Sequence, residues 1–92
     1  MGRDVEFKNH DRFVQLGITI AAIRKIRGLS QEKLSEKAGI SRGYLSIIEA
    51  PGMAQDFTME TFFNIADALE VDPVELIRAS MVPDSVMKMK KE

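Results

Sequence analysis

The 92-residue chain contains no cysteine, no tryptophan, one histidine and three prolines. Without cysteine there can be no disulfide and no thiolate metal site, and His10 alone cannot form a metal site. No apolar run approaches the roughly 18 residues that a membrane span needs, and the N-terminus does not resemble a signal peptide. We therefore expect a single cytoplasmic domain without a metal, a cofactor or a membrane association.

A strong excess of charge is also lacking, because the formal net charge is −1. The distribution of charge is more informative. Positions 44–84 hold eight acidic residues and one basic residue, Arg78. Positions 24–42 hold two acidic residues and six basic ones: Arg24, Lys25, Arg27, Lys33, Lys37 and Arg42. Such a cluster either lies by chance on a solvated face or marks a surface for nucleic acid.

Apolar residues recur three and four positions apart, which predicts five helices and no strand. We expect the helices at residues 12–27, 31–37, 41–49, 58–69 and 73–80, within one domain of residues 12–80. Residues 1–11 would form a flexible arm and residues 81–92 a tail rich in Met and Lys. Met59 and Ala66 are expected on the inner face of the fourth helix, beside a core formed by Phe13, Leu16, Ile20, Ile23, Leu29, Leu34, Ala38, Leu45, Ile48, Phe62, Ile65, Leu69, Val71, Leu76 and Ile77.

Polar residues that favour helix starts stand at or just before the start of each predicted helix. They are Asp11, Ser30, Ser41, Thr58 and Asp72. A second apolar line on the first helix, formed by Ile18, Ala22 and Ile26, lies beside its core face. Either the C-terminal tail or a second subunit can cover this line, and the sequence does not favour one over the other.

The segment of residues 31–50 contains two short predicted helices joined by a tight turn at positions 38–40. Gly39 can adopt the left-handed conformation that closes the first of these helices, and Ser41 can cap the second. A second helix held in this way can enter the major groove of DNA. The segment therefore has the helix-turn-helix pattern.

Further features flank this motif at consistent spacing. They are a Leu-Gly opening, an Arg late in the first helix, a Leu-Ser-Gln entry, a Gly-Ile-Ser turn, a Leu-Ser-x-Ile-Glu second helix and a later Ile-Ala-x-Ala-Leu. Taken in order over residues 16–77, they make the chain resemble the phage-repressor-type helix-turn-helix family, also called XRE or Cro. The resemblance implies an all-α, compact five-helix bundle of the lambda-repressor-like type. It also implies a transcriptional regulator, with repression favoured, that binds double-stranded DNA as a homodimer and docks helix 41–49 in the major groove.

The resemblance also assigns roles to individual residues. Arg24 and Glu49 match an ion pair that links the first helix to the end of the recognition helix. Base contacts would come from Arg42, Gly43, Ser46 and Ile47, and contacts to the DNA backbone from Gln31, Ser41 and Tyr44. Arg42 is the strongest of these, since a guanidinium can donate two hydrogen bonds to O6 and N7 of guanine.

Two features depart from the family pattern. Ile47 stands where a polar or basic residue is frequent, so it would meet a thymine methyl or belong to a protein-contact surface. The segment of residues 50–57 offers no positive charge for phosphate and includes Asp56. Fewer phosphate contacts would give weaker and less salt-dependent binding per monomer.

These departures leave a second hypothesis open. The chain would be a protein-interaction module, or the antitoxin of a toxin–antitoxin pair, with weak or partner-dependent DNA binding. An enzyme is the least favoured class, because Glu60, Asp67 and Glu70 fall on the solvent side of a helix and no catalytic motif or small-molecule site is evident. If the chain forms a dimer, helix 73–80 together with the tail is the first candidate for the interface, and the Ile18/Ile26 line is the second.

Overall fold

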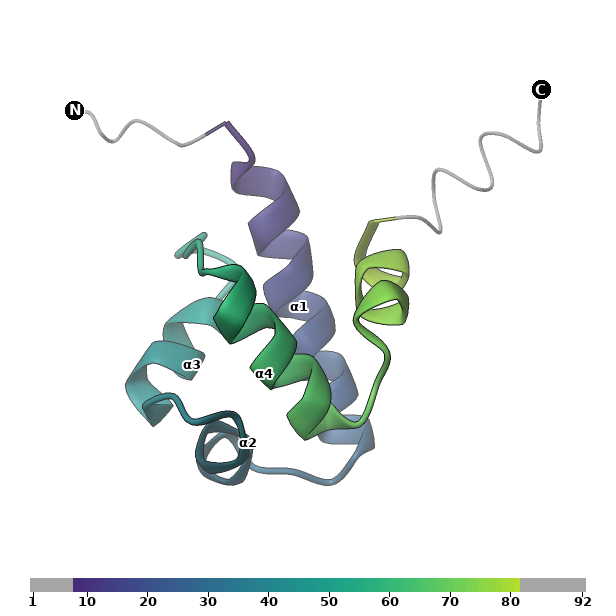
Figure 1. Ribbon diagram of the computed structural model, residues 1–92. Coiled ribbons are helices and arrows are strands. Elements are labelled where there is room, and N and C mark those ends of the chain that lie inside the picture. The colour runs from purple at the N-terminus through teal and green to yellow at the C-terminus, as the bar shows by residue number, and fades with distance from the viewer. Residues whose placement is uncertain (1–7, 82–92) are drawn as a thin grey trace.

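The computed structural model describes residues 8–81. Within this range the chain forms five helices and no strand (Figure 1). They are α1 (His10–Ile26), α2 (Gln31–Ala38), α3 (Arg42–Glu49), α4 (Met59–Leu69) and a fifth helix at residues 73–81. The predicted all-α five-helix architecture is confirmed. The predicted arm and tail fall largely on residues 1–7 and 82–92, outside the described residues.

Side-chain caps start most of these helices, as predicted. The hydroxyl oxygens of Ser30, Ser41 and Thr58 each accept a hydrogen bond from the backbone N–H three residues later, at 3.0, 3.0 and 3.1 Å. Asp72 caps the fifth helix, since its Oδ1 accepts from the Val74 N–H at 2.8 Å. Each cap satisfies a backbone donor that the helix itself leaves without a partner.

The start of α1 differs from the prediction. The helix begins at His10, and Asn9 holds the N-cap position without a side-chain capping bond. Asp11, the predicted cap, instead lies in the first turn, where a carboxylate still interacts favourably with the positive end of the helix dipole. Phe13 extends the apolar face of α1 into this first part, so tertiary packing rather than a cap sets the start.

The core lies where α1, α2, α3 and α4 meet, with α2 packed on both α3 and α4, and α1 packed on α3. The fifth helix contributes Leu76, which is fully buried. Every residue predicted for the core is either buried or packed against it. Met59, expected on the inner face of α4, is instead 61% exposed, whereas Ala66, expected on the same face, is buried.

The apolar line on α1 faces outward in this structure. Ile26 is 81% exposed and Ile18 is 41% exposed, so the described residues leave both side chains open to solvent. In Figure 1 the α2–α3 unit and the fifth helix, drawn in yellow-green, lie on opposite sides of α1 and α4. Among residues 8–81, none of the helices combines the length and the apolar character that crossing a membrane requires.

Candidate nucleic-acid interface

The turn between α2 and α3 has the geometry expected from its sequence. Gly39 lies in the left-handed region at φ 73°, and the N–H groups of Gly39 and Ile40 donate to carbonyl oxygens of the last turn of α2. A side chain with a Cβ is disfavoured in this conformation. The chain then re-enters a helix directly after the Ser41 cap, so α3 is held at a fixed angle to α2.

Helix α3 has one buried face and one exposed face. Leu45 and Ile48 pack in the core, and Glu49 is only 7% exposed. The predicted base-contacting residues all lie on the exposed side: Arg42, Gly43, Ser46 and Ile47. Tyr44 is half-buried at the edge of this face.

A glycine on α1 lets α3 approach closely. Gly17 is buried, and a Cβ added to it would overlap the backbone carbonyl of Ile48. No other residue fits here without moving the two helices apart. In the sequence, Gly17 stands out only as part of a Leu-Gly pair. The available signal was a glycine in the middle of a helix, which is unfavourable unless packing requires it.

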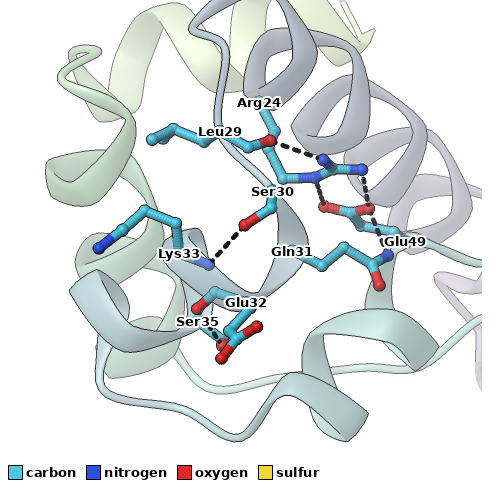
Figure 2. Close-up of polar contacts among 8 residues, drawn as sticks. All are labelled: Arg24, Leu29, Ser30, Gln31, Glu32, Lys33, Ser35 and Glu49. Carbon is cyan, nitrogen blue, oxygen red and sulfur yellow. Dashed lines mark hydrogen bonds and ion pairs between the residues drawn. The ribbon is translucent and has the colours of Figure 1, made fainter.

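Arg24 and Glu49 form the ion pair that the resemblance implies, at the other end of the same contact. The Arg24 Nε donates to Glu49 Oε2 at 2.8 Å and its Nη2 donates to Glu49 Oε1 at 3.0 Å, so the pair is bidentate (Figure 2). The Arg24 Nη1 donates to the Leu29 carbonyl at 2.8 Å. The two side chains are 11% and 5% exposed. A planar bidentate pair fixes orientation as well as distance, so it sets where the end of α3 lies relative to α1.

Gln31 belongs to the same cluster. Its amide Nε2 donates to Glu49 Oε1 at 2.9 Å, as Figure 2 shows. The side chain therefore links the first residue of α2 to the last residue of α3, a role that its position in the sequence does not indicate. Its predicted contact with a DNA phosphate would have to use the remaining amide atoms or the backbone N–H groups at the start of α2.

A depression between the starts of α2 and α3 brings several of these residues together. It is lined by Arg24, Ser30, Gln31, Glu32 and Arg42. Both helix N-termini therefore open on the same side of the molecule as Arg42. Free backbone N–H groups and the positive ends of two helix dipoles favour an anion here, although Glu32 adds a negative charge to the rim.

Tertiary contacts use two of the six basic residues in the segment of residues 24–42. Arg24 is held by Glu49, and Arg27 caps the end of α4 by donating to the Leu69 carbonyl at 2.9 Å and the Glu70 carbonyl at 3.1 Å. The exposed basic residues that remain are Lys25, Lys33, Lys37 and Arg42. Lys33 lies 3.6 Å from Glu36 in a solvated pair. The basic surface is therefore smaller than the sequence alone indicated.

The loop between α3 and α4 carries no basic residue, and one of its side chains serves the core. Phe57 packs edge-on against Phe13 of α1, with ring centroids 5.0 Å apart. Ala54 adopts a positive φ of 48°. The loop thus ties the end of α3 to α1 rather than presenting charge to a phosphate backbone.

Comparisons with known proteins agree with this geometry. A family model described as a helix-turn-helix domain matches residues 17–80. An uncharacterized HTH-type transcriptional regulator from Sinorhizobium fredii is 36% identical over 62 residues, which cover 67% of this chain and 78% of that protein.

Solved structures share the fold. The restriction-modification controller protein C.AhdI from Aeromonas hydrophila has a TM-score of 0.65 and 30% identity, covering 70% of this chain and 94% of the other. The clp gene regulator ClgR from C. glutamicum has a TM-score of 0.66 over 78% of this chain and 95% of its own, and at 23% identity it supports the fold alone. Together with the helix-turn-helix geometry, these matches show that the chain belongs to the phage-repressor-type (XRE/Cro) helix-turn-helix family of DNA-binding transcriptional regulators.

Proposed function

We propose that this chain is a sequence-specific repressor that binds double-stranded DNA as a homodimer and places α3 in the major groove. The observation that carries the proposal is the division of α3 into two faces. Its inner face and its last residue are fixed by Gly17 and by the Arg24–Glu49 pair, whereas its outer face is exposed. A helix that is rigidly held and open on one side can read base edges.

In this proposal Arg42 reads a guanine and Ser46 makes a second polar contact to a base edge. Gln31, Ser41 and Tyr44 lie at the rim of the same face and position α3 against the phosphate backbone. Gly43 allows the backbone of α3 to approach the groove, since no atom lies within 4 Å of a Cβ at that position.

The similarity to proteins named as regulators supports a role in gene control. A symmetric dimer would place its two recognition helices roughly 34–36 Å apart, one turn of DNA. Repression follows if such a site overlaps a promoter. A reporter gene placed behind the bound site should then be expressed more strongly when the chain is deleted.

A binding assay at several salt concentrations tests the DNA-reading assignment. Wild type should bind its own promoter region more tightly than random DNA, and Arg42→Ala should lose about 1–3 kcal/mol of that preference. Arg78→Ala is the matched control, because Arg78 is exposed on the fifth helix and forms a solvated pair with the nearby Glu75, at 3.6 Å. Equal and weak binding of both DNAs by wild type and Arg42→Ala would remove the assignment.

A second candidate is an interaction module or antitoxin whose DNA binding depends on a protein partner. Exposed apolar side chains near the loop favour it, because Met53, Met59 and Phe63 are 59%, 61% and 45% exposed. Co-purification with the product of a neighbouring gene, together with failure of the isolated chain to bind any duplex, would select this candidate over the first.

A further inference from the structure

The outermost line of α3 carries no hydrogen-bonding side chain. With 3.6 residues per turn, positions 43 and 47 lie about 150–170° from the centre of the buried face formed by Leu45, Ile48 and Glu49. Ser46 lies about 110° and Arg42 about 70° from that centre. The centre line therefore consists of Gly43, which has no side chain, and Ile47, which is 37% exposed.

Ile47 can match only one kind of group in the major groove. Base edges there present hydrogen-bond donors, acceptors and the C5 methyl group of thymine. An isoleucine pressed against a donor or an acceptor would remove its water without replacing the hydrogen bond, which is unfavourable. Against a methyl group the same side chain gains apolar contact. Gly43, one turn earlier, leaves room for the helix to come this close.

We infer that Ile47 selects a 5-methylpyrimidine in each half of the DNA site, by packing on the methyl group. Thymine and 5-methylcytosine both carry this group at the same place in the groove. The inference rests on the proposed function, since it needs α3 in the major groove. Binding would then respond to methylation of a cytosine at that position.

The test begins by selecting preferred sites from a random duplex library with the full-length chain. Each thymine of the preferred site is then replaced by deoxyuridine, which removes the methyl group and keeps the hydrogen-bonding pattern. Replacing the contacted thymine in one half-site should cost wild type about fourfold in affinity, the effect of one buried methyl group, and replacing it in both half-sites should cost roughly the square of that factor. Ile47→Ala should bind the thymine and deoxyuridine forms equally at that position. For Ile47→Val, the ratio of the two affinities should lie between those of wild type and Ile47→Ala.

Ile26→Ala is the matched control, because Ile26 is 81% exposed on α1 and lies outside the motif. It should keep the wild-type ratio between thymine and deoxyuridine, even if its overall affinity changes. In a second arm the same position carries cytosine or 5-methylcytosine. Wild type should prefer the methylated base by about the same factor, and Ile47→Ala should not.

The outcomes separate the two proposals. If no sequence is enriched by the selection, the proposed DNA reading fails and this inference fails with it. If a site is enriched but wild type binds thymine and deoxyuridine equally at every position, only the role of Ile47 is overturned. A ratio that persists in Ile47→Ala would also overturn it, because another residue would then contact the methyl group.

Discussion

Gly17 and Gly43 are both glycines within helices, but they have different structural roles. Gly17 is pressed against the Ile48 carbonyl, whereas Gly43 has open space where its Cβ would lie. The first glycine therefore sets the distance between α1 and α3. The second leaves the outer face of α3 flat.

The two positions make a matched pair of variants. Gly17→Ala should lower the free energy of unfolding by about 1–3 kcal/mol, because its methyl group overpacks the α1–α3 contact. Gly43→Ala should raise it by about 0.5–1 kcal/mol, since alanine is the better helix former and meets no neighbour. Urea denaturation of both variants measures the free energy of unfolding. A Gly17→Ala protein as stable as wild type would contradict the close approach of α1 and α3.

The Arg24–Glu49 pair predicts non-additive variants. Arg24→Met would leave the nearly buried Glu49 carboxylate with a hydrogen bond from the Gln31 amide but without its charged partner. We expect the free energy of unfolding to fall by about 3–5 kcal/mol. Glu49→Leu should cost a similar amount. The double variant should recover much of the loss, because two apolar side chains replace two desolvated charges.

A double-mutant cycle by urea denaturation measures this coupling. Lys33→Ala serves as the control, because the Lys33–Glu36 pair is solvated and should contribute less than about 1 kcal/mol. Strictly additive losses at positions 24 and 49 would show that the two side chains do not act as a unit.

At the scale of the element, the end of α4 is held by contacts from far along the chain. Its last turn is followed by Glu70 at φ 62°, a left-handed conformation that usually requires glycine. Arg27 donates to the carbonyl oxygens of Leu69 and Glu70 across this end. The arginine thus satisfies carbonyl groups that the helix cannot satisfy itself.

Glu70→Gly should therefore stabilise the protein by about 1 kcal/mol. The glycine relieves the left-handed strain and removes a carboxylate from the negative end of the helix dipole, while the backbone carbonyl remains for Arg27. Asp67→Gly, three residues earlier within the helix, should instead destabilise it. Thermal denaturation measures the Tm of both variants. A lower Tm for Glu70→Gly than for wild type would show that Glu70 is not strained.

In the molecule as a whole, exposed apolar side chains lie on and beside the fifth helix. Val74 on the fifth helix is 59% exposed, and a groove of about 350 Å³ lies beside this helix, with Phe13, Phe57, Ile77 and Met81 among its lining residues. The line of Ile18 and Ile26 on α1 is the competing surface. The proposed homodimer needs one of these surfaces, and the groove favours the fifth helix.

Gel filtration with light scattering should therefore find a dimer for wild type. Val74→Glu should shift the equilibrium toward the monomer, since it would bury an unpaired charge in the interface. Ile26→Glu should remain dimeric. The reverse result would move the interface to α1, and a monomeric wild type at all concentrations would remove the dimer from the proposal.

The helices, most of their caps and the core could be predicted from the sequence. These features depend on local rules, because a serine caps the turn that follows it and apolar residues three or four apart share one face. The same local rules located the helix-turn-helix motif. The DNA-contacting roles of Arg42, Ser46 and Ile47 stay predictions, because they concern a second molecule.

Which polar residues are available to contact DNA depends on the tertiary packing. Arg27 contacts the end of α4 from 42 residues away, and the Arg24–Glu49 pair, 25 residues apart, was expected only from the resemblance to the family. The use of Gln31 against Glu49 and the need for Gly17 arise in the same way. No local pattern specifies such distances, since they depend on how α1, α3 and α4 pack. Packing thus assigns two of the six clustered basic residues to the fold and leaves exposed the face of α3 that is proposed to contact DNA.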